Sequence, residues 1–418
     1  MSAQIDSKPS LIIPANQSLI FSIKDSLGTP PDRFVVWVLE NGVEIAKLYL
    51  TPNTNSVVFF NLAEVVRDRV KVDDKIRDES ETLFSYSTLP FTTGRNGLKK
   101  YVVNVGTYTG GVESGTDDTG IVYLLDGVEQ VSAGLHPSFA DYYSTALTQK
   151  TWLTDRKLET NGKINIEVSD DDEGCIAFLN DSTIISGLAT NVFYTLSDAS
   201  GTQLQADIKA IASATGAQLP SDTNIGKKLT YLMAYPKNLD KWLPTVDRPV
   251  NNPTWAYYEM SLLTTGYAQT SKVYRFNRKC TQEKHKNTQL AWTNSVGGWD
   301  SVLFTGRTEH TDTVSSKPFR KEIGDWDAST YSFLPQARES QAYQVTGKSS
   351  FTLISIDFSF ADIELIKYAI RSDNLMMRAG SGDWMPVVID TKSYNVKERF
   401  SGVFSVSLTV TLAQSLRC

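Results

Sequence analysis

The sequence predicts an all-β protein, mainly antiparallel, with two or three β-sandwich-like domains and a few short helices. Two observations carry this prediction. Short β-branched or alternating apolar runs recur along the 418 residues, and clusters of Gly, Pro, Asn, Asp and Ser separate them. Hydrophobic residues make up 41% of the chain and charged residues 21%, which is enough apolar material to bury real cores.

The amino-terminal region predicts a hairpin. The run Arg33–Glu40 is rich in apolar residues, Asn41-Gly42 follows it, and Val43–Leu50 resumes an alternating pattern. Asn-Gly between two such runs is typical of a two-residue turn, because both residues accept a positive φ. Another strand is expected at Ser56–Phe60.

A short helix is expected directly after that strand. Asn61 stands three residues before Glu64, which is the spacing of a cap in which each side chain bonds the other residue's backbone. We expect the helix to run through Val70. The charged stretch 68–81 that follows predicts a boundary or an exposed loop.

The middle of the chain continues the β pattern. Strands are predicted at Lys100–Tyr108 and Ile121–Leu125, with the Gly-rich segment 110–120 between them as loop. The segment Gln203–Ala214 fits a helical face and strand alternation equally, and we favour the strand. Residues 242–253 carry three prolines and predict a linker.

These breaks divide the chain into three expected domains. The first is a β-sandwich-like domain over 1–80, the second a β-rich domain over 81–245, and the third a β-rich domain with one helix over 246–418. The clearest helix is predicted from Ala361 to Arg371, because Ser359 and Asp362 have the spacing of a capping box. The run Val403–Leu412 alternates so cleanly that one face should enter a core.

No motif for catalysis, a metal or a cofactor is found. The three histidines have no ligand spacing, and the three cysteines (Cys175, Cys280 and Cys418) form no C-x-x-C pair. The chain contains no Gly-x-Ser-x-Gly elbow and no phosphate-binding loop. We therefore expect no enzyme activity, no cofactor and no metal. The acidic run 170–173 lacks the spacing of a calcium loop, so a solvated hairpin turn is favoured over a cation site.

Charge and hydropathy argue against nucleic acid as the main partner and against a membrane span. The formal net charge is −6, whereas binding to nucleic acid phosphates requires a concentrated basic face. We favour a solvated face for the one local basic run, which consists of Arg275, Arg278, Lys279, Lys284 and Lys286. No apolar run is long enough to span a bilayer, and the first residues do not resemble a signal peptide.

The most distinctive motif is a Gly-Gly hairpin between residues 291 and 304, and it is the candidate interaction site. Its two aromatic residues predict either a core hairpin or, alternatively, a platform on which a sugar could stack. Its polar residues can each close a turn by bonding nearby backbone. The candidate residues are Trp292, Asn294, Gly297, Gly298, Trp299 and Asp300.

This motif, Trp-x-Asn-x-x-Gly-Gly-Trp-Asp, resembles virion structural proteins of the tail or neck of tailed phages that infect Bacteroidetes-type bacteria. The segments Phe34–Val70 and Trp384–Ile389, the latter followed by Ser393-Tyr394, are similar too. The resemblance implies a tail or neck ring, hub or baseplate-type protein that assembles symmetrically. Its implied partners are copies of itself and other tail or neck proteins, and its implied location is the virion, assembled in the host cytoplasm.

Two other functions remain open from the sequence. One is a tail protein that binds a receptor or a host surface glycan through the tryptophans and the Tyr-rich loops. The other is an enzyme such as a depolymerase, which the lack of catalytic motifs disfavours. Particle mass would separate assembly from glycan binding.

Overall fold

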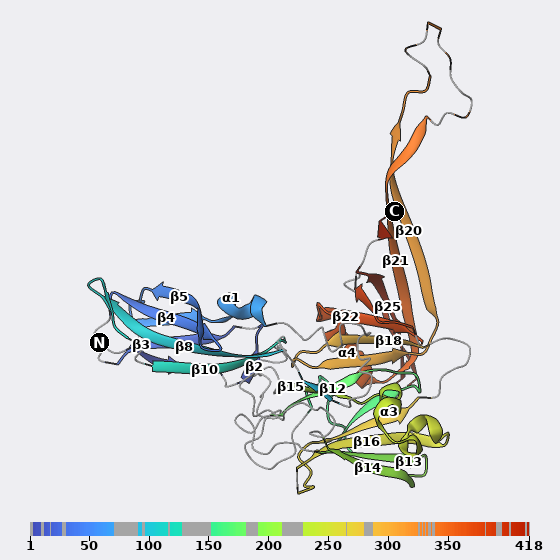
Figure 1. The fold of residues 1–418 in the computed structure, drawn as a ribbon, viewed down its shortest axis with the longest axis horizontal. Helices are drawn as coiled ribbons and strands as arrows, with labels where there is room; N and C mark the ends of the chain where they lie inside the picture. Colours follow the sequence, from blue (N-terminus) through green and yellow to red (C-terminus); the bar gives the residue numbers. More distant parts are fainter. Residues whose placement is uncertain are drawn as a thin grey trace. The chain divides into compact units, whose positions relative to one another are not determined.

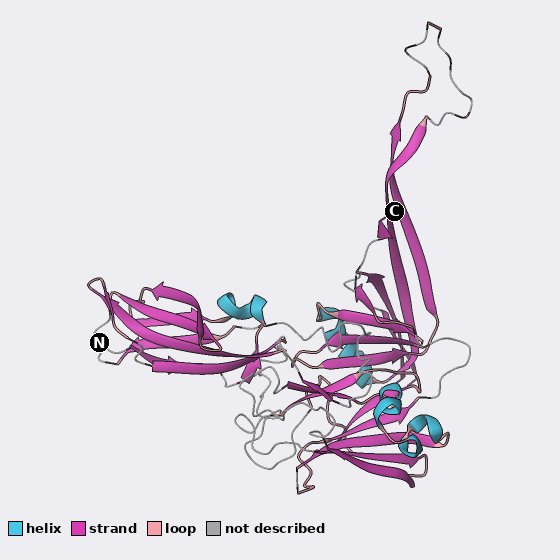
Figure 2. Ribbon diagram, in the orientation of Figure 1, coloured by secondary structure: helices cyan, strands magenta, loops and turns pink. Residues whose placement is uncertain are grey.

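In the computed structural model, strands dominate and most strand pairs are antiparallel, so the predicted all-β class with sandwich-like domains is confirmed (Figure 2). The chain forms two compact units, Met1–Thr281 with Ala291–Val302 and Glu364–Ser372, and Gln282–Leu290 with Leu303–Ile363 and Asp373–Cys418. The structure describes residues 3–9, 12–16, 18–26, 31–70, 91–93, 97–115, 118–127, 152–180, 191–210, 229–264, 266–279, 287–324, 327, 329–330, 332, 336, 339–380, 382–389, 395–400, 403–413 and 416–417.

A first sandwich lies in the amino-terminal part of the first unit (Figure 1). Buried side chains from both of its sheets, Phe21 and Phe60 from one and Val36 and Val103 from the other, share one core. One sheet has the order β1 (Ala3–Ser7), β3 (Ile20–Asp25), β6 (Val57–Asn61). The other has the order β2 (Ile12–Pro14), β10 (Asp118–Leu125), β8 (Leu98–Thr109), β4 (Arg33–Glu40), β5 (Val43–Leu50), with β9 (Val112–Glu113) beside β8.

The predicted hairpin is confirmed as β4 and β5, which pair in antiparallel register. Asn41 has φ of 51° and Gly42 has φ of 86°, so both turn residues adopt the left-handed conformation that the Asn-Gly pair was expected to supply.

The helix after β6 is shorter than predicted. Helix α1 covers Ala63–Val66, its N-cap position is Leu62, and a 3₁₀ turn at Arg67–Arg69 follows it. The side chain of Asn61 is used differently from a capping box, because its Oδ1 accepts the backbone N–H of Leu19 at 2.9 Å and of Ala63 at 3.2 Å. The charged stretch predicted next lies outside the described residues beyond Val70.

The segment 110–120 is only partly loop. Gly110 and Gly111 make a turn with φ of 60° and 86°, but β9 follows directly and β10 already begins at Asp118. The chain therefore reverses within two residues, and Val112, Glu113 and residues 118–120 belong to the sheet.

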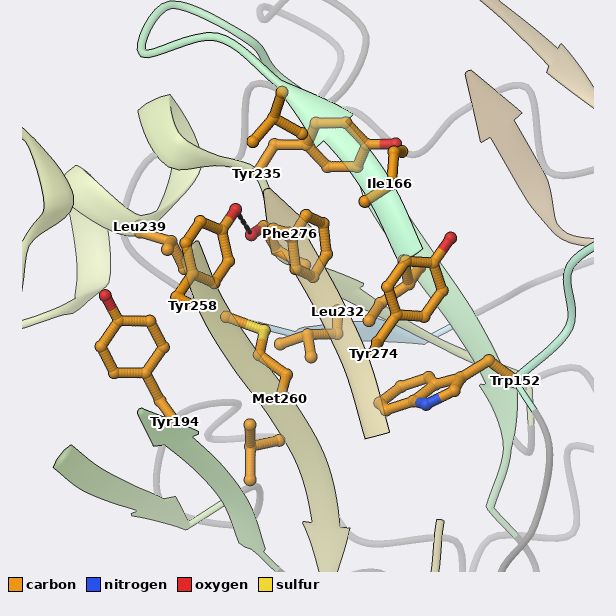
Figure 3. Packing of buried hydrophobic residues seen from close by; sticks show 14 of the residues in the cluster. Trp152, Ile166, Tyr194, Leu232, Tyr235, Leu239, Tyr258, Met260, Tyr274 and Phe276 are labelled. Atoms are coloured by element: carbon orange, nitrogen blue, oxygen red, sulfur yellow. Dashed lines mark hydrogen bonds between the residues drawn. The ribbon is translucent and has the colours of Figure 1, made fainter. Parts of the chain in front are cut away.

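A second sandwich fills the middle of the first unit. A cluster of aromatic residues lies between its sheets, and Tyr258 stacks on Phe276 with ring centroids 4.6 Å apart (Figure 3). The Tyr258 hydroxyl donates to the Ala234 carbonyl at 2.8 Å. One sheet has the order β11 (Lys163–Val168), β17 (Val273–Arg278), β16 (Trp255–Leu263), β13 (Asn191–Asp198), β14 (Gln203–Ala210), and the other β12 (Cys175–Leu179), β15 (Leu229–Met233), β7 (Phe91–Thr93).

These sandwiches place the domain boundaries elsewhere than at residues 80 and 245. Strands β8 and β10 lie beyond residue 80 but belong to the first sandwich, since β8 pairs with both β4 and β10. Strand β16 lies beyond residue 245 but pairs with β13 along its length. The predicted linker is instead occupied by the end of helix α3 (Pro236–Trp242) and by two 3₁₀ turns, Thr245–Asp247 and Pro249–Asn251.

The acidic run is not a solvated hairpin turn. The strands on either side of it, β11 and β12, lie in different sheets. Asp172 is 5% exposed and Glu173 is 4% exposed. The Asp172 carboxylate accepts the backbone N–H of Ser169 at 2.8 Å and its hydroxyl at 2.7 Å, so this segment is folded on itself by hydrogen bonds. Strand β14 (Gln203–Ala210) confirms the favoured strand over these residues, and the rest of the predicted segment lies outside the described residues.

A nine-stranded sheet contains the carboxyl-terminal strands, and the division between the two units falls within β18 and β19. Helix α4 (Phe360–Arg371) confirms the predicted helix, and its cap is reciprocal: Ser359 Oγ accepts the Asp362 N–H at 3.2 Å while Asp362 accepts the Ser359 N–H at 3.1 Å. The main order is β19 (Trp299–Phe304), β18 (Thr288–Thr293), β22 (Leu375–Ala379), β23 (Met385–Val388), β25 (Val403–Leu412), β21 (Ser340–Phe358), β20 (Thr308–Arg320), with β24 (Asn395–Phe400) beside β25 and β26 (Leu416–Arg417) beside β21.

Candidate functional site

The Gly-Gly hairpin is a turn organised by one asparagine. The N–H of Asn294 donates to the Gly298 carbonyl at 2.9 Å, and its Oδ1 accepts the N–H groups of Val296 at 3.2 Å and Gly298 at 2.7 Å. Its Nδ2 donates outward, to the Leu153 carbonyl at 2.9 Å and to Asp300 at 3.2 Å. This one side chain therefore closes the turn and ties it to a segment about 140 residues earlier in the chain.

The two glycines are required for different reasons. Gly297 has φ of 81°, in the left-handed region that glycine adopts without strain. Gly298 is constrained by space instead, because a Cβ there would lie 2.1 Å from the Leu153 carbonyl oxygen. A Cβ on Gly297 would also lie 2.8 Å from the Asp126 carbonyl oxygen. Backbone from two other segments thus touches the turn directly.

Asp300 lies at the centre of a buried polar network and is 3% exposed. Its carboxylate accepts the Thr154 hydroxyl at 2.5 Å and the Asp155 N–H at 2.8 Å. Asp155 in turn accepts the N–H of Ser295 at 3.0 Å and its hydroxyl at 2.5 Å. Burial raises the pKa of Asp300, and the positive charge of Arg156 and these hydrogen bonds oppose that rise.

The Arg156 guanidinium extends the network to the neighbouring strands. It donates to the Ser301 carbonyl at 2.6 Å and to the Asn165 carbonyl at 3.3 Å, and the Ser301 hydroxyl lies 2.7 Å from the Tyr235 hydroxyl. Both carboxylate oxygens of Asp300 accept protein donors. The arrangement therefore holds the turn in place.

Neither tryptophan of the motif presents a ring to solvent. Trp292 is fully buried and Trp299 is 3% exposed. A sugar that stacks on an indole ring needs one open ring face, so the geometry favours the core interpretation of these two residues over the glycan platform.

All six candidate residues therefore lie together at one buried turn, but their partners were missed from the sequence. Thr154, Asp155 and Arg156 form a short polar run that looks like an ordinary loop. Gly127 also approaches the turn closely, because a Cβ there would lie 2.3 Å from the Ser295 carbonyl oxygen. The signal that could have found them is co-variation with the turn, which one sequence does not contain.

The basic run is largely neutralised where the structure describes it. Arg275 contacts Glu259 at 2.5 Å, Arg278 contacts Asp170 at 2.6 Å, and Lys279 pairs with Glu167. Lys284 and Lys286 lie outside the described residues. Within the described ranges, no three His, Cys, Asp or Glu residues come together in a way that could hold a metal ion. No helix there has the length and apolarity needed to cross a membrane.

A two-stranded ribbon formed by β20 and the first half of β21 is the second feature of interest among the described residues. Its register runs from the pair Thr308–Leu353 to the pair Arg320–Ser340 (Figure 1). Every residue of β20 after Thr308 is exposed, including Val314 at 69% and Phe319 at 40%. At about 3.4 Å per residue, β20 is about 40 Å long. Sequence reasoning missed this ribbon, because its strands are polar on both faces.

The ribbon also has open strand edges. Strand β20 is the last strand of the sheet, and β25 pairs with β21 only from Ser350 onward. Beyond that point, β26 covers only Thr346 and Gly347 among the described residues. Open edges offer unpaired backbone N–H and C=O groups to another chain.

The comparisons with known proteins identify no relative. The chain matches no known protein family and no curated protein. Among solved structures, the tail of an empty gene transfer agent particle with C6 symmetry is 13% identical, covering 33% of this chain and 99% of that one with a TM-score of 0.21. The virion of a native gene transfer agent particle is 10% identical over 33% and 99% with a TM-score of 0.19, and a Salmonella alpha-2-macroglobulin mutant is 10% identical over 100% and 34% with a TM-score of 0.16. At these TM-scores the likenesses support no statement about function.

Proposed function

We propose that this chain is a structural component of a tailed-phage virion, of the tail or neck ring, hub or baseplate type, that assembles symmetrically. Its partners are copies of itself and other tail or neck proteins, and it assembles in the host cytoplasm. The proposal includes no catalytic activity and no cofactor. The motif resemblance to virion proteins of Bacteroidetes-type phages supports it.

The observation that carries the assembly part of this proposal is the exposed ribbon. A two-stranded ribbon with both faces in water is at best marginally stable alone, because it buries almost no apolar surface. A neighbouring subunit that pairs with the open edge of β20 or packs against Val314 would supply the missing burial. In a closed ring each copy gives its ribbon to the next one, so no open edge is left over.

The ribbon also carries protection against unlimited pairing. The register shifts between Ser316 and Pro318, and Lys317 lies within that irregularity. A proline and a lysine on an edge strand oppose pairing with an arbitrary second strand. The open edge therefore favours a defined neighbour over general aggregation.

The experiment compares two matched valine substitutions in the full chain. Val314 on the ribbon is 69% exposed and Val246 in the first unit is 66% exposed, so Val314→Lys and Val246→Lys change the same side chain at equal exposure. The native mass of each protein is measured, and the particles are imaged by negative-stain electron microscopy. We expect rings from the unsubstituted chain and from Val246→Lys, and a shift of Val314→Lys towards single subunits. A chain that stays monomeric at all concentrations and joins no virion would contradict the proposal.

A further inference from the structure

The sheet of the first sandwich that contains β4 has an outer face, opposite to the face that enters the shared core. Strand β4 buries Phe34, Val36 and Val38 between the two sheets. Because side chains alternate along a strand, Val35 and Trp37 point to the opposite, outer face of the same sheet. The register across β5, β4 and β8 continues this face, and it is best seen at the strands labelled β4, β5 and β8 in Figure 1.

The register gathers aromatic residues from three strands on this outer face. Trp37 lies opposite Lys47 and Val35 lies opposite Tyr49. Tyr49 meets Tyr108 edge to face, with ring centroids 5.6 Å apart at 77°. We call this group the aromatic face; it consists of Trp37, Lys47, Tyr49, Tyr108 and Glu113.

Its aromatic rings lie close to the sheet surface. Val35 points outward yet is fully buried. A Cβ on Gly106 would lie 2.8 Å from Trp37 Cζ3 and 2.9 Å from Cη2. The benzenoid end of the indole therefore lies against bare backbone, where a side chain on Gly106 would push it away. Trp37 is half-buried, and Tyr49 is 42% exposed.

A neutral polar rim accompanies the rings. Lys47 Nζ lies over the Trp37 ring and over the Tyr49 ring, 5.6 Å from each ring centroid. It also donates to the Glu113 carboxylate at 2.8 Å, and the Tyr49 hydroxyl donates to the same carboxylate. Lys47 and Glu113 carry opposite charges, so this ion pair offers both donors and acceptors without a net charge of its own.

We propose that the aromatic face binds a neutral saccharide. The apolar C–H face of a pyranose ring packs on the electron-rich face of an indole or a phenol ring. Sugar hydroxyls both donate and accept, so they can bond the Glu113 carboxylate and the Lys47 ammonium together. A charged glycan would meet a rim whose own charges already cancel, and therefore a neutral one fits better. This site is separate from the ribbon, and it does not depend on the proposed assembly.

The test uses the full chain on an array of immobilised oligosaccharides that contains neutral hexose polymers and acidic, uronate-containing ones. Trp37→Ala removes the platform and Trp37→Phe keeps a smaller ring. Phe59→Ala is the control, because Phe59 is 65% exposed and lies on β6 in the other sheet of the same sandwich. We expect retention on neutral glycans, a loss of about tenfold or more in affinity for Trp37→Ala, a smaller loss for Trp37→Phe, and none for Phe59→Ala. Melting temperatures and native masses are measured on the same samples.

Three outcomes would overturn the proposal. The unsubstituted chain is retained on no neutral oligosaccharide, or Trp37→Ala binds as well as Phe59→Ala does, or Trp37→Ala lowers the native mass with no saccharide bound by any variant. The last result would make the aromatic face a protein interface instead. If Trp37→Ala does not fold, the same comparison is made with Tyr49→Ala. A chain that binds a glycan but never assembles leaves this proposal standing and refutes the assembly.

Discussion

The buried turn around Asn294 and the exposed ribbon of β20 and β21 are both reversals of antiparallel strands, but they are stabilised in opposite ways. In the turn, Asp300 is 3% exposed and both of its carboxylate oxygens accept protein donors. In the ribbon, Val314 is 69% exposed and β20 has an open edge. The turn is therefore held within its own chain, and the ribbon is left for contacts that its own chain does not supply.

The difference shows how polarity alone misleads. Both segments are rich in Ser, Thr, Asn and Asp. In the turn these groups bond one another and exclude water, so the loss of one partner leaves a buried group unsatisfied. In the ribbon water replaces any lost partner, so stability should change little. Substitutions in the two regions should thus separate stability from assembly.

The largest expected effect is from Trp299→Ala in the turn. Trp299 is 3% exposed, and truncating a buried tryptophan costs about 3–5 kcal/mol of unfolding free energy. Urea unfolding monitored by circular dichroism measures the loss. A Trp299→Ala protein with unchanged stability and assembly that no longer attaches to host cells would instead make this tryptophan a receptor-binding residue.

Gly298→Ala is expected to have the next largest effect on stability. The added Cβ would meet the Leu153 carbonyl oxygen at 2.1 Å, and backbone must move to relieve the contact. We expect the unfolding free energy to fall by about 3 kcal/mol, and Gly298→Val should lower it by at least as much. Gly115→Ala is the control, because a Cβ there meets nothing within 4 Å. Equal melting temperatures for the two alanine variants would show that the turn yields easily and is not a scaffold.

Asp300→Asn tests the polar network, and we expect it to lower the unfolding free energy by about 2 kcal/mol. The new amide NH₂ would face the Asp155 N–H or the Thr154 hydroxyl, and a buried donor would lose its acceptor.

The unsubstituted chain and Asp300→Asn should also differ in how their unfolding free energy depends on pH. Burial raises the pKa of Asp300 in the folded state above its ordinary value of 3.8. The folded state then binds the proton more tightly than the unfolded state, so this stabilisation is present at low pH and is lost as pH rises through the folded pKa. The stability gap between the unsubstituted chain and Asp300→Asn should narrow over that range. If the gap widens as the pH rises, the charge of Arg156 lowers the pKa of Asp300 by more than burial raises it.

Local signals predicted local structure well. Asn41-Gly42 gave a hairpin with two positive φ values, Ser359 and Asp362 gave a reciprocal helix cap, and Val406, Leu408 and Val410 are buried on one face of β25 as their alternation indicates. Each depends on residues within a few positions of one another. A local pattern is therefore enough to specify them.

Long-range arrangement could not be predicted in the same way. The segment holding Thr154 and Asp155 looks like a loop, and only the fold brings it to Asp300. The Pro-rich stretch before Pro253 resembles a linker, but β13, which precedes it in the chain, and β16, which follows it, pair with each other. The ribbon has no apolar alternation, because neither of its faces enters a core of its own chain.

The most direct test of the account is the native mass of a chain with a shortened ribbon. Replacing residues 314–347 by Asn-Gly joins Thr313 to Lys348, which are already opposite each other, and removes the open distal strands. Native mass spectrometry should find the full chain as a closed multi-subunit particle and the shortened chain as a single folded subunit with its remaining sheets intact. A shortened chain that forms the same particle would contradict the assignment of assembly to the ribbon.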